Sequence, residues 1–206
     1  YDAAHHHPDA EVRKVNQTFY EFMVPLVKGY STEMSLEVTS LGIQVHGGMG
    51  FIEETGAAQY YRDAKILTIY EGTTAIQSND LVGRKTLRDG GQNAKGIASQ
   101  IEATEAELRK NGSANAVAVA QRLQAAREAF LDVVNFMAST SNPNAIYAGS
   151  VPYLMLAGNL MAGWQMARAL LVAQQQLAAG VDAAFMQAKI TTARFYADHL
   201  LTKAPG

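Results

Sequence analysis

The 206-residue sequence contains no cysteine, and this absence limits the chemistry it can carry. Without thiols the chain has no disulfide framework, no cysteine nucleophile and no thiolate metal site. The lack of cysteine also fits a reducing compartment, and we expect a cytoplasmic protein. Any redox chemistry would then need a bound cofactor.

The sequence also lacks an excess of charge of either sign. It has 17 basic and 19 acidic residues, which gives a formal net charge of −2. A protein that binds nucleic acid or anionic lipid usually carries a concentrated basic surface. We therefore expect neither partner.

The N-terminal residues, YDAAHHHPDAEVRK, include neither an initiator methionine nor the basic and apolar regions of a signal peptide. We therefore expect the C-terminal part of a longer protein. His5, His6 and His7 raise the question of a metal site, but consecutive side chains point in different directions and do not converge on one ion. We favour polar surface residues at the start of a helix and predict no metal site.

Helical periodicity runs through almost the whole chain, and no convincing strand pattern interrupts it. The hydrophobic content of 48% is sufficient for a core, so the fold class is predicted to be all-α. Pro25 should kink or close the first long helix. The expected helices cover residues 9–28, 31–45, 57–64, 73–87, 119–137, 151–172 and 182–200.

Two of these helices carry specific expectations about packing. The long helix has an apolar seam spaced 4-3-4-3-4, formed by Val119, Leu123, Ala126, Phe130, Val133 and Met137. The last helix has apolar positions at Phe185, Ile190, Ala193 and Phe195. Glycine at 158 and 163 should mark close helix contacts.

The stretch 88–96, RDGGQNAKG, has the composition of a linker. We therefore predict a first domain over residues 1–88, a linker over 89–96 and a helical extension over 97–206. The apolar run 151–172 is long enough to span a bilayer, but Asn159, Gln165 and Arg168 interrupt it. A central arginine costs about 2.5 to 3.5 kcal/mol on insertion scales, so we predict a buried bundle helix and no membrane span.

The stretch 46–56, HGGMGFIEETG, is the strongest loop prediction, because closely spaced glycines are costly inside a helix. The dinucleotide fingerprint requires a strand before the glycines, whereas a helix precedes them here. Freed backbone amides can still contact a cofactor held by another domain or subunit. His46 is either a base or cofactor contact or a cap of the preceding helix, and the sequence leaves both open.

Glu71 lies between two helical patterns in the stretch 60–77, YYRDAKILTIYEGTTAIQ. It is either an acid near a helix N-terminus, where the helix dipole favours it, or a catalytic base removed from solvent in a substrate cleft. Gly72 would let a ligand approach the backbone. The pattern alone does not choose between these roles. For Arg62 and Asp63 we favour structural pairing, each with a different partner.

Three blocks, QVHGGMGF (44–51), YRDAKI (61–66) and IYEGTTAIQ (69–77), together resemble the C-terminal helical domain of the acyl-CoA dehydrogenases. The resemblance is close over residues 1–88. The later helices resemble the extra domain of a subgroup that includes the 3-methylmercaptopropionyl-CoA dehydrogenases. The resemblance implies part of an up-down four-helix bundle, followed by a second helical bundle.

The resemblance also implies a function, the FAD-dependent oxidation of an acyl-CoA to the trans-2-enoyl-CoA. Glu71 matches the base that removes the α-proton, and Gly72 would lie against the substrate thioester. Electron-transfer flavoprotein would accept the electrons. The FAD of the same subunit would be approached by Thr73, Thr74 and Ala75. The FAD of a neighbouring subunit, in a homodimer or homotetramer, would be contacted by Gln44, Val45, His46, Gly47 and Gly48.

Two alternatives stay open at this point. Some relatives of these dehydrogenases pass electrons directly to oxygen, so an acyl-CoA oxidase is possible. A non-catalytic helical module of the same fold is the second alternative, although the intact YEGT motif argues against it. One departure from the family is Gln59, which stands where many members have lysine or arginine and so puts a local salt bridge to Asp63 in doubt.

Overall fold

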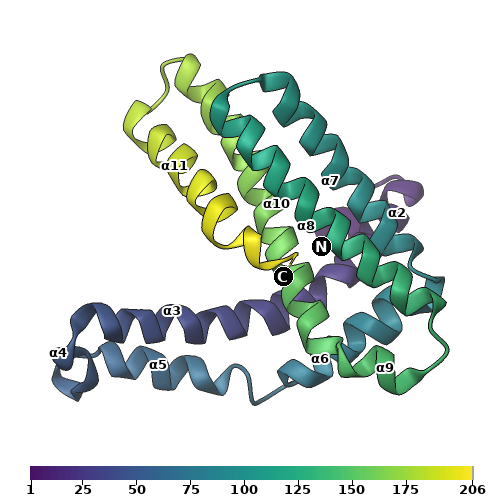
Figure 1. Ribbon diagram of the computed structural model, residues 1–206, viewed down its shortest axis with the longest axis horizontal. Helices are drawn as coiled ribbons and strands as arrows, with labels where there is room; N and C mark the ends of the chain where they lie inside the picture. Colours follow the sequence, from purple (N-terminus) through teal and green to yellow (C-terminus); the bar gives the residue numbers. More distant parts are fainter. Residues whose placement is uncertain (206) are drawn as a thin grey trace. The chain divides into compact units, whose positions relative to one another are not determined.

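The computed structural model describes residues 1–205, and every regular element in that range is helical, which confirms the all-α prediction (Figure 1). The chain forms two compact units. Unit 1 comprises Tyr1–Arg88 and Asn142–Leu154, and unit 2 comprises Asp89–Ser141 and Met155–Gly206. Residues 142–154 therefore fold with unit 1, although the sequence places them in the extension.

Unit 1 begins with the helices α1 and α2, of which α2 ends at the proline expected to close it. Pro25 has no amide hydrogen to continue the α-helical bonding, and a π-helical turn, η1, follows directly. The remaining elements of this unit alternate short helices and turns. The elements of residues 1–89 are α1 Asp2–His5, α2 Ala10–Pro25, η1 Leu26–Tyr30, α3 Ser31–His46, α4 Gly48–Phe51, η2 Glu53–Thr55, α5 Ala57–Ile66, α6 Thr74–Asp80, η3 Leu81–Thr86 and η4 Leu87–Asp89.

The predicted loop 46–56 is more ordered than its glycine content suggests. It contains the single turns α4 and η2, bounded by Gly47 and Gly56, both of which have positive φ. Thr55 links the two turns because its hydroxyl donates to the carbonyl of Met49 at 2.5 Å. Glycine at each boundary allows the reversals of direction, and the residues between them close into helical turns.

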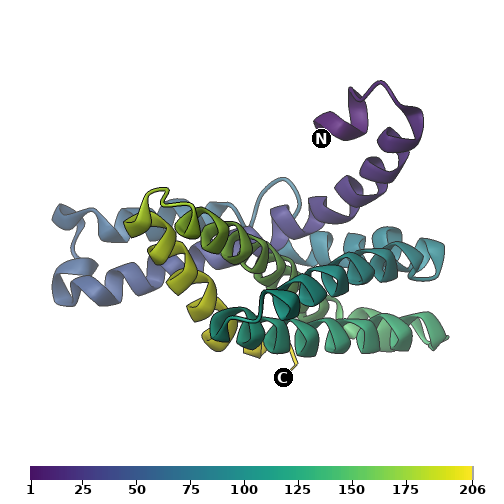
Figure 2. The same cartoon turned by 90° about the horizontal axis from the view of Figure 1, so that it is seen from above.

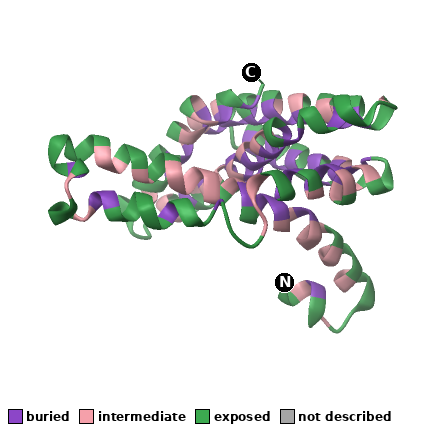
Figure 3. Cartoon of the chain, turned by 90° about the horizontal axis from the view of Figure 1, so that it is seen from below, coloured by how far each residue is buried: buried purple, intermediate pink, exposed green. Residues whose placement is uncertain are grey.

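The helices α3 and α5 form a hairpin and lie side by side in both views (Figures 1 and 2). They meet through the small side chains of Ala57, Ala58 and Ala64 on α5, which are buried. No residue of α3 is buried, and Figure 3 shows the hairpin mostly in the exposed and intermediate colours. Several large apolar side chains on it are more than half exposed: Val38, Leu41, Val45, Tyr60 and Ile66.

The core of unit 1 lies where α2, η1, α6 and η3 meet residues 142–154. Its most buried apolar side chains are Phe22, Leu26, Leu81, Val82 and Leu154. Residues 142–154 include the helix α9, Pro143–Ala148, and the first turn of α10, Ser150–Ala178. This segment is therefore part of the core on which α6 rests.

Two buried hydrogen bonds attach the start of α10 to the rest of unit 1. The hydroxyl of Ser78 donates to that of Ser150 at 3.2 Å, and the hydroxyls of Thr86 and Tyr153 lie 2.9 Å apart. Burial raises the pKa of Tyr153, so this phenol stays neutral. Buried polar groups that are satisfied in this way restrict packing to one arrangement.

Unit 2 is a bundle of four helices that run up and down in turn (Figure 1). They are α7 Gln92–Asn111, α8 Ala114–Ser139, α10 from Met155 onward and α11 Ala183–His199, with a final turn η5 Leu201–Lys203. The helix α7 begins inside the range 89–96 that the composition assigns to a linker. Only Gly90 and Gly91, both with positive φ, separate it from the preceding turn.

The seam of α8 differs from the expected one at a single position. Val119, Leu123, Ala126, Phe130 and Met137 are buried as expected, but the fifth position is Val134, whereas Val133 is only half-buried. An α-helix turns once in 3.6 residues, so a strict seven-residue pattern drifts around a straight helix. The seam 4-3-4-4-3 follows this drift.

The prediction for α11 was right at two positions and wrong at two. Ile190 and Ala193 are buried, but Phe185 is 52% exposed and Phe195 is 57% exposed. The third buried residue is Ala197, so the inward face follows the 3-4 spacing of an α-helix. The close contact expected at Gly163 is confirmed, because a β-carbon there would lie 2.8 Å from the side chain of Leu201.

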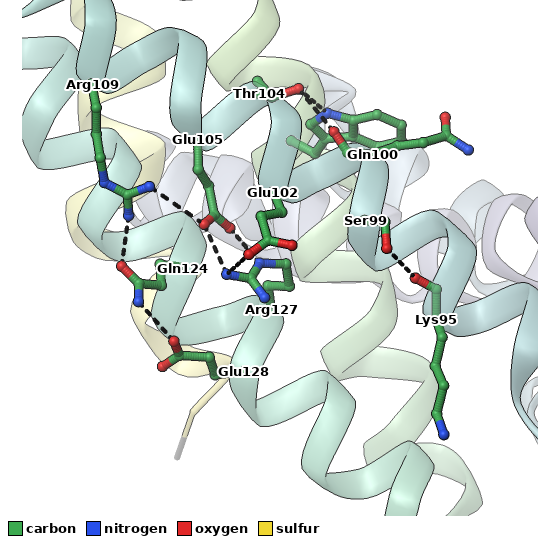
Figure 4. Close-up of polar contacts among 11 residues, drawn as sticks. Lys95, Ser99, Gln100, Glu102, Thr104, Glu105, Arg109, Gln124, Arg127 and Glu128 are labelled. Carbon is green, nitrogen blue, oxygen red and sulfur yellow. Dashed lines mark hydrogen bonds and ion pairs between the residues drawn. The ribbon is translucent and has the colours of Figure 1, made fainter.

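A buried ion pair joins α7 to α8 within unit 2 (Figure 4). Arg127 donates to both carboxylate oxygens of Glu105, at 2.7 and 3.0 Å. This carboxylate raises the pKa of Arg127, so the guanidinium remains charged. On α7, the hydroxyl of Thr104 accepts a hydrogen bond from the indole N–H of Trp164 on α10 at 2.8 Å.

None of the helices in residues 1–205 combines the length and the hydropathy that crossing a membrane requires. The run expected to form a buried helix is part of α10, in which Leu154, Leu160 and Leu170 are fully buried. Gln165 and Arg168 lie on its exposed side.

Candidate active site

Glu71 and Gly72 lie in the turn that connects α5 to α6. Both have left-handed backbone conformations, with φ of 50° at Glu71 and 99° at Gly72. For a residue with a side chain, this conformation costs roughly 1 to 2 kcal/mol. Such strain is typical of functional sites, and here it falls on the acid that the sequence singles out.

The side chain of Glu71 is exposed, and it forms no hydrogen bond or ion pair with residues 1–205. A catalytic base was expected to be withdrawn from solvent, and the described residues do not provide this shielding. The apolar side chains of Ile69, Tyr70 and Ile76 flank the turn and are about half exposed. A partner that covered them would also remove water from Glu71.

The three residues predicted to lie near a cofactor begin α6. Thr73 is its N-cap, with its hydroxyl oxygen accepting from the amide of Ile76 at 3.5 Å. The hydroxyl of Thr74 donates to the carboxylate of Glu33 on α3. Ala75 is exposed. The contact with Glu33 was not predicted, because 41 residues separate it from Thr74 and no local pattern links them.

The segment from Gln44 to Gly48 lies at the far end of α3, and all five of its residues are exposed. Gly47 has a φ of 62°, and no atom lies within 4 Å of the place where a β-carbon would stand at Gly47 or Gly48. The backbone here is open to close approach, as contact with a cofactor held elsewhere requires. His46 is the last residue of α3, so both of its proposed roles stay open.

The structure does not bring the two predicted groups of cofactor residues together. Thr74 contacts Glu33 near the start of α3, whereas His46 ends the same helix. A helix rises 1.5 Å per residue, so the 13 residues from Glu33 to His46 span about 20 Å. The two groups therefore cannot line one small pocket within a single copy of this chain.

The side chain of Gln59 connects Arg62 and Asp63. Its amide group donates to the carboxylate of Asp63 at 2.6 Å, and its carbonyl accepts from Arg62 at 2.7 Å. Arg62 also lies 3.4 Å from the carboxylate of Glu53. Gln59 thus takes part in a hydrogen bond to Asp63 where a salt bridge was in doubt. Arg62 and Asp63 both have local pairing partners, but the expectation of a different partner for each was wrong in part, because they share Gln59.

The three N-terminal histidines lie at the turn between α1 and α2. The ring of His5 stacks on Tyr1, with centroids 4.1 Å apart, and His7 accepts from the amide of Asp9. Within residues 1–205, no group of three histidine, aspartate or glutamate side chains is arranged to hold a metal ion.

Two family models together match nearly all of the chain. One, described as the acyl-CoA dehydrogenase C-terminal domain, matches residues 1–85. The other, described as acetyl-CoA dehydrogenase C-terminal like, matches residues 97–206. The residues between the two matches, 86–96, include Gly90 and Gly91, which separate α7 from the preceding turn.

Individual relatives agree with the family models. A 3-methylmercaptopropionyl-CoA dehydrogenase of Ruegeria pomeroyi is 57% identical over 98% of this chain. A broad-specificity linear acyl-CoA dehydrogenase of Mycobacterium tuberculosis is 34% identical over 95%, and a butyryl-CoA dehydrogenase of Syntrophomonas wolfei is 32% identical over 95%. The matches cover 34%, 33% and 32% of these proteins, so the chain spans about a third of their length. The helical fold, the two family models and these relatives show that the chain belongs to the acyl-CoA dehydrogenase family and corresponds to its C-terminal region.

Proposed function

We propose that this chain is the C-terminal part of an FAD-dependent acyl-CoA dehydrogenase and that Glu71 is its catalytic base. The observation that carries the proposal is the turn at Glu71 and Gly72. Its backbone is strained, its carboxylate is not engaged by residues 1–205, and half-exposed apolar residues precede and follow it in the sequence. A carboxylate that no described residue engages is free to act on a substrate.

The reaction we propose is the α,β-dehydrogenation of an acyl-CoA thioester to the trans-2-enoyl-CoA. The carboxylate of Glu71 takes the α-proton, which is acidic only when the thioester carbonyl is polarised and the base is shielded from water. Gly72 is the residue directly after the base, and we propose that the thioester binds against it. FAD, when bound, supplies the acceptor for the hydride that leaves the β-carbon.

The residues present fit an FAD contact at two separate places. At the start of α6 they are Thr73, Thr74 and Ala75, and at the end of α3 they are Gln44, Val45, His46, Gly47 and Gly48. A span of about 20 Å separates the groups. We propose that the first group approaches the FAD of its own subunit and the second that of a neighbouring subunit, in a homodimer or homotetramer.

The exposed apolar face of the α3–α5 hairpin supports the same assembly. Val38, Leu41 and Val45 are each more than half exposed. A patch of this kind on a stable protein is normally covered by another segment or subunit. Electron-transfer flavoprotein is the electron acceptor we propose, and a cytoplasmic location stays a prediction.

The first substrate to test is 3-methylmercaptopropionyl-CoA, since the relative of that name is 57% identical over this chain. The complete FAD-loaded enzyme should be yellow, and its flavin absorbance should bleach when this thioester is added without oxygen. Slow return of the colour in air would indicate a dehydrogenase, and rapid return would indicate an oxidase. A purified complete protein without flavin would contradict the proposal and favour a non-catalytic module.

A further inference from the structure

The side chain of Gln77, on α6, lies directly against the backbone of the residue that follows Glu71. Gln77 is only 7% exposed. A β-carbon added to Gly72 would stand 2.4 Å from the side-chain nitrogen of Gln77. Real β-carbons essentially never approach a heavy atom so closely, so the carboxamide occupies the space that a side chain at residue 72 would need.

Gln77 is held from its other side as well. A β-carbon at Gly29, in the π-helical turn η1, would stand 3.1 Å from the β-carbon of Gln77 and 2.7 Å from the side chain of Leu154. Gly29 therefore lets both side chains pack closely. Because Leu154 is fully buried near the start of α10, the glutamine has little room to move away from Gly72.

The helix that carries Gln77 is anchored at both ends. At its start, Thr74 donates to Glu33. Near its end, the buried hydroxyl of Ser78 donates to Ser150 on α10. With α6 fixed in this way, the position of the Gln77 carboxamide is set by packing, which is what a residue that orients a catalytic group requires.

We propose that Gln77 is a positioning residue for Glu71. Its carboxamide packs against the backbone at Gly72, and this contact limits the directions in which the Glu71 carboxylate can point. The carboxylate has no partner of its own among residues 1–205, so the backbone of the turn is what orients it. The inference rests on the proposed role of Glu71 as the base.

Packing alone would not require an amide at position 77. The carboxamide is the part of Gln77 nearest to residue 72, since its nitrogen lies 2.4 Å and its carbon 3.7 Å from the place of a β-carbon at Gly72. An amide that holds the turn affects the chemical step, whereas substrate affinity depends on the whole length of the acyl-CoA. Misplacement of a catalytic group by about 1 Å can cost about a hundredfold in rate, so even a small shift of the turn should be measurable.

The test is Gln77→Met in the complete FAD-loaded enzyme, since methionine keeps the length of the side chain and removes the amide. Stopped-flow flavin reduction is measured with 3-methylmercaptopropionyl-CoA and with butyryl-CoA. We expect the rate constant at saturating substrate to fall at least about tenfold, with the half-saturating concentration changed less than about twofold. Gln187→Met, at an exposed position of α11, is the matched control and should leave both unchanged.

If Gln77→Met does not yield FAD-bound enzyme, Gln77→Leu, which also removes the amide and adds no charge, carries the same test. A rate constant equal to that of the wild type would overturn the positioning role. An equal loss of rate constant and of substrate affinity, together with a lower Tm, would also overturn it, because it would indicate general damage to the fold. Glu71→Gln is measured alongside. If that variant reduces flavin normally, the proposed function fails; if only Gln77→Met is normal, the positioning role alone fails.

Discussion

At the scale of single residues, the central feature is the pair of left-handed residues, Glu71 and Gly72. The strain at Glu71 is tolerated because the surrounding packing allows few other conformations of the turn. At Gly72 two requirements coincide, a φ of 99° and close approach of a neighbouring side chain. Only glycine meets both.

Gly72→Ala should therefore be more destabilising than the same change at a glycine that has a positive φ but no neighbouring side chain close to it. Gly180 is such a glycine, with a φ of 77° and no atom within 4 Å of a β-carbon. In both variants the left-handed conformation of the alanine lowers the free energy of unfolding by roughly 1 to 2 kcal/mol. Gly72→Ala must in addition displace the side chain of Gln77. Thermal unfolding should show a larger fall in Tm for Gly72→Ala; equal falls would mean that the contact with Gln77 is easily relieved.

Asp198 provides a prediction of pH dependence at the same scale. A hydrogen bond from Arg194 and the charge of Arg122 hold the pKa of Asp198 below its ordinary value. A lowered folded-state pKa contributes stability above the unfolded value of about 3.9, and this contribution is lost as the pH falls through the folded pKa.

Asp198→Asn should therefore lower stability at neutral pH and make the acid-induced fall in Tm, at and below about pH 4, less steep. The control is Asp132→Asn, because Asp132 is exposed on α8 and forms no ion pair with residues 1–205. Parallel acid profiles for the wild type and Asp198→Asn would show that the ion pairs of Asp198 contribute nothing.

At the scale of elements, the ion pair between Glu105 and Arg127 fixes α7 against α8. Taking both charges out of water is costly, and the two bonds between them offset that cost. Removing one partner leaves the other charge buried with only a longer contact, which is Arg109 at 3.8 Å for Glu105 and Glu102 at 3.8 Å for Arg127. The pair is thus a sensitive test of how these two helices pack.

Glu105→Leu or Arg127→Met alone should destabilise unit 2 by about 3 to 5 kcal/mol, whereas the double variant should recover most of that loss. Urea unfolding followed by circular dichroism measures the difference. Arg109→Met, at a half-exposed position 3.8 Å from the same glutamate, is the control and should cost about 1 kcal/mol or less. Additive single losses in the double variant would contradict a coupled pair.

The elements also show what the sequence can and cannot predict. Periodicity is a local signal, so α2, α3, α5 and α8 were expected close to their observed positions. The predicted seam of α8 was wrong at one position, Val134, because a strict seven-residue pattern drifts around a helix of 3.6 residues per turn. The predicted face of α11 was wrong at Phe185, because this apolar residue faces outward. Helical turns inside a glycine-rich loop, as in α4, leave no periodic signal because each is only one turn long.

Contacts between segments that are distant in the sequence could not be predicted for a different reason. The close approaches of Gln77 and of Leu154 to Gly29 depend on how helices pack, and neither side chain looks unusual in its local pattern. The same is true of Asn142–Leu154, which joins unit 1 despite its position in the extension. The motif around Glu71 was found by resemblance, whereas its exposure required the structure.

At the scale of the whole molecule, the described residues include the proposed base and the proposed cofactor contacts but not the shielding that such a base needs. Glu71 is exposed, and the apolar residues around it and along the α3–α5 hairpin are uncovered. The chain spans about a third of its relatives, so the missing cover is expected from other parts of the enzyme or from a second subunit.

The measurement that tests the central claim most directly is stopped-flow flavin reduction by Glu71→Gln in the complete FAD-loaded enzyme. Glutamine keeps the size of the side chain and removes the base. The variant should bind FAD and 3-methylmercaptopropionyl-CoA as the wild type does, yet reduce its flavin at least about a thousandfold more slowly. Glu107→Gln, at an exposed position on α7, should reduce flavin normally. Flavin reduction by Glu71→Gln at the wild-type rate would contradict the assignment of Glu71 as the base.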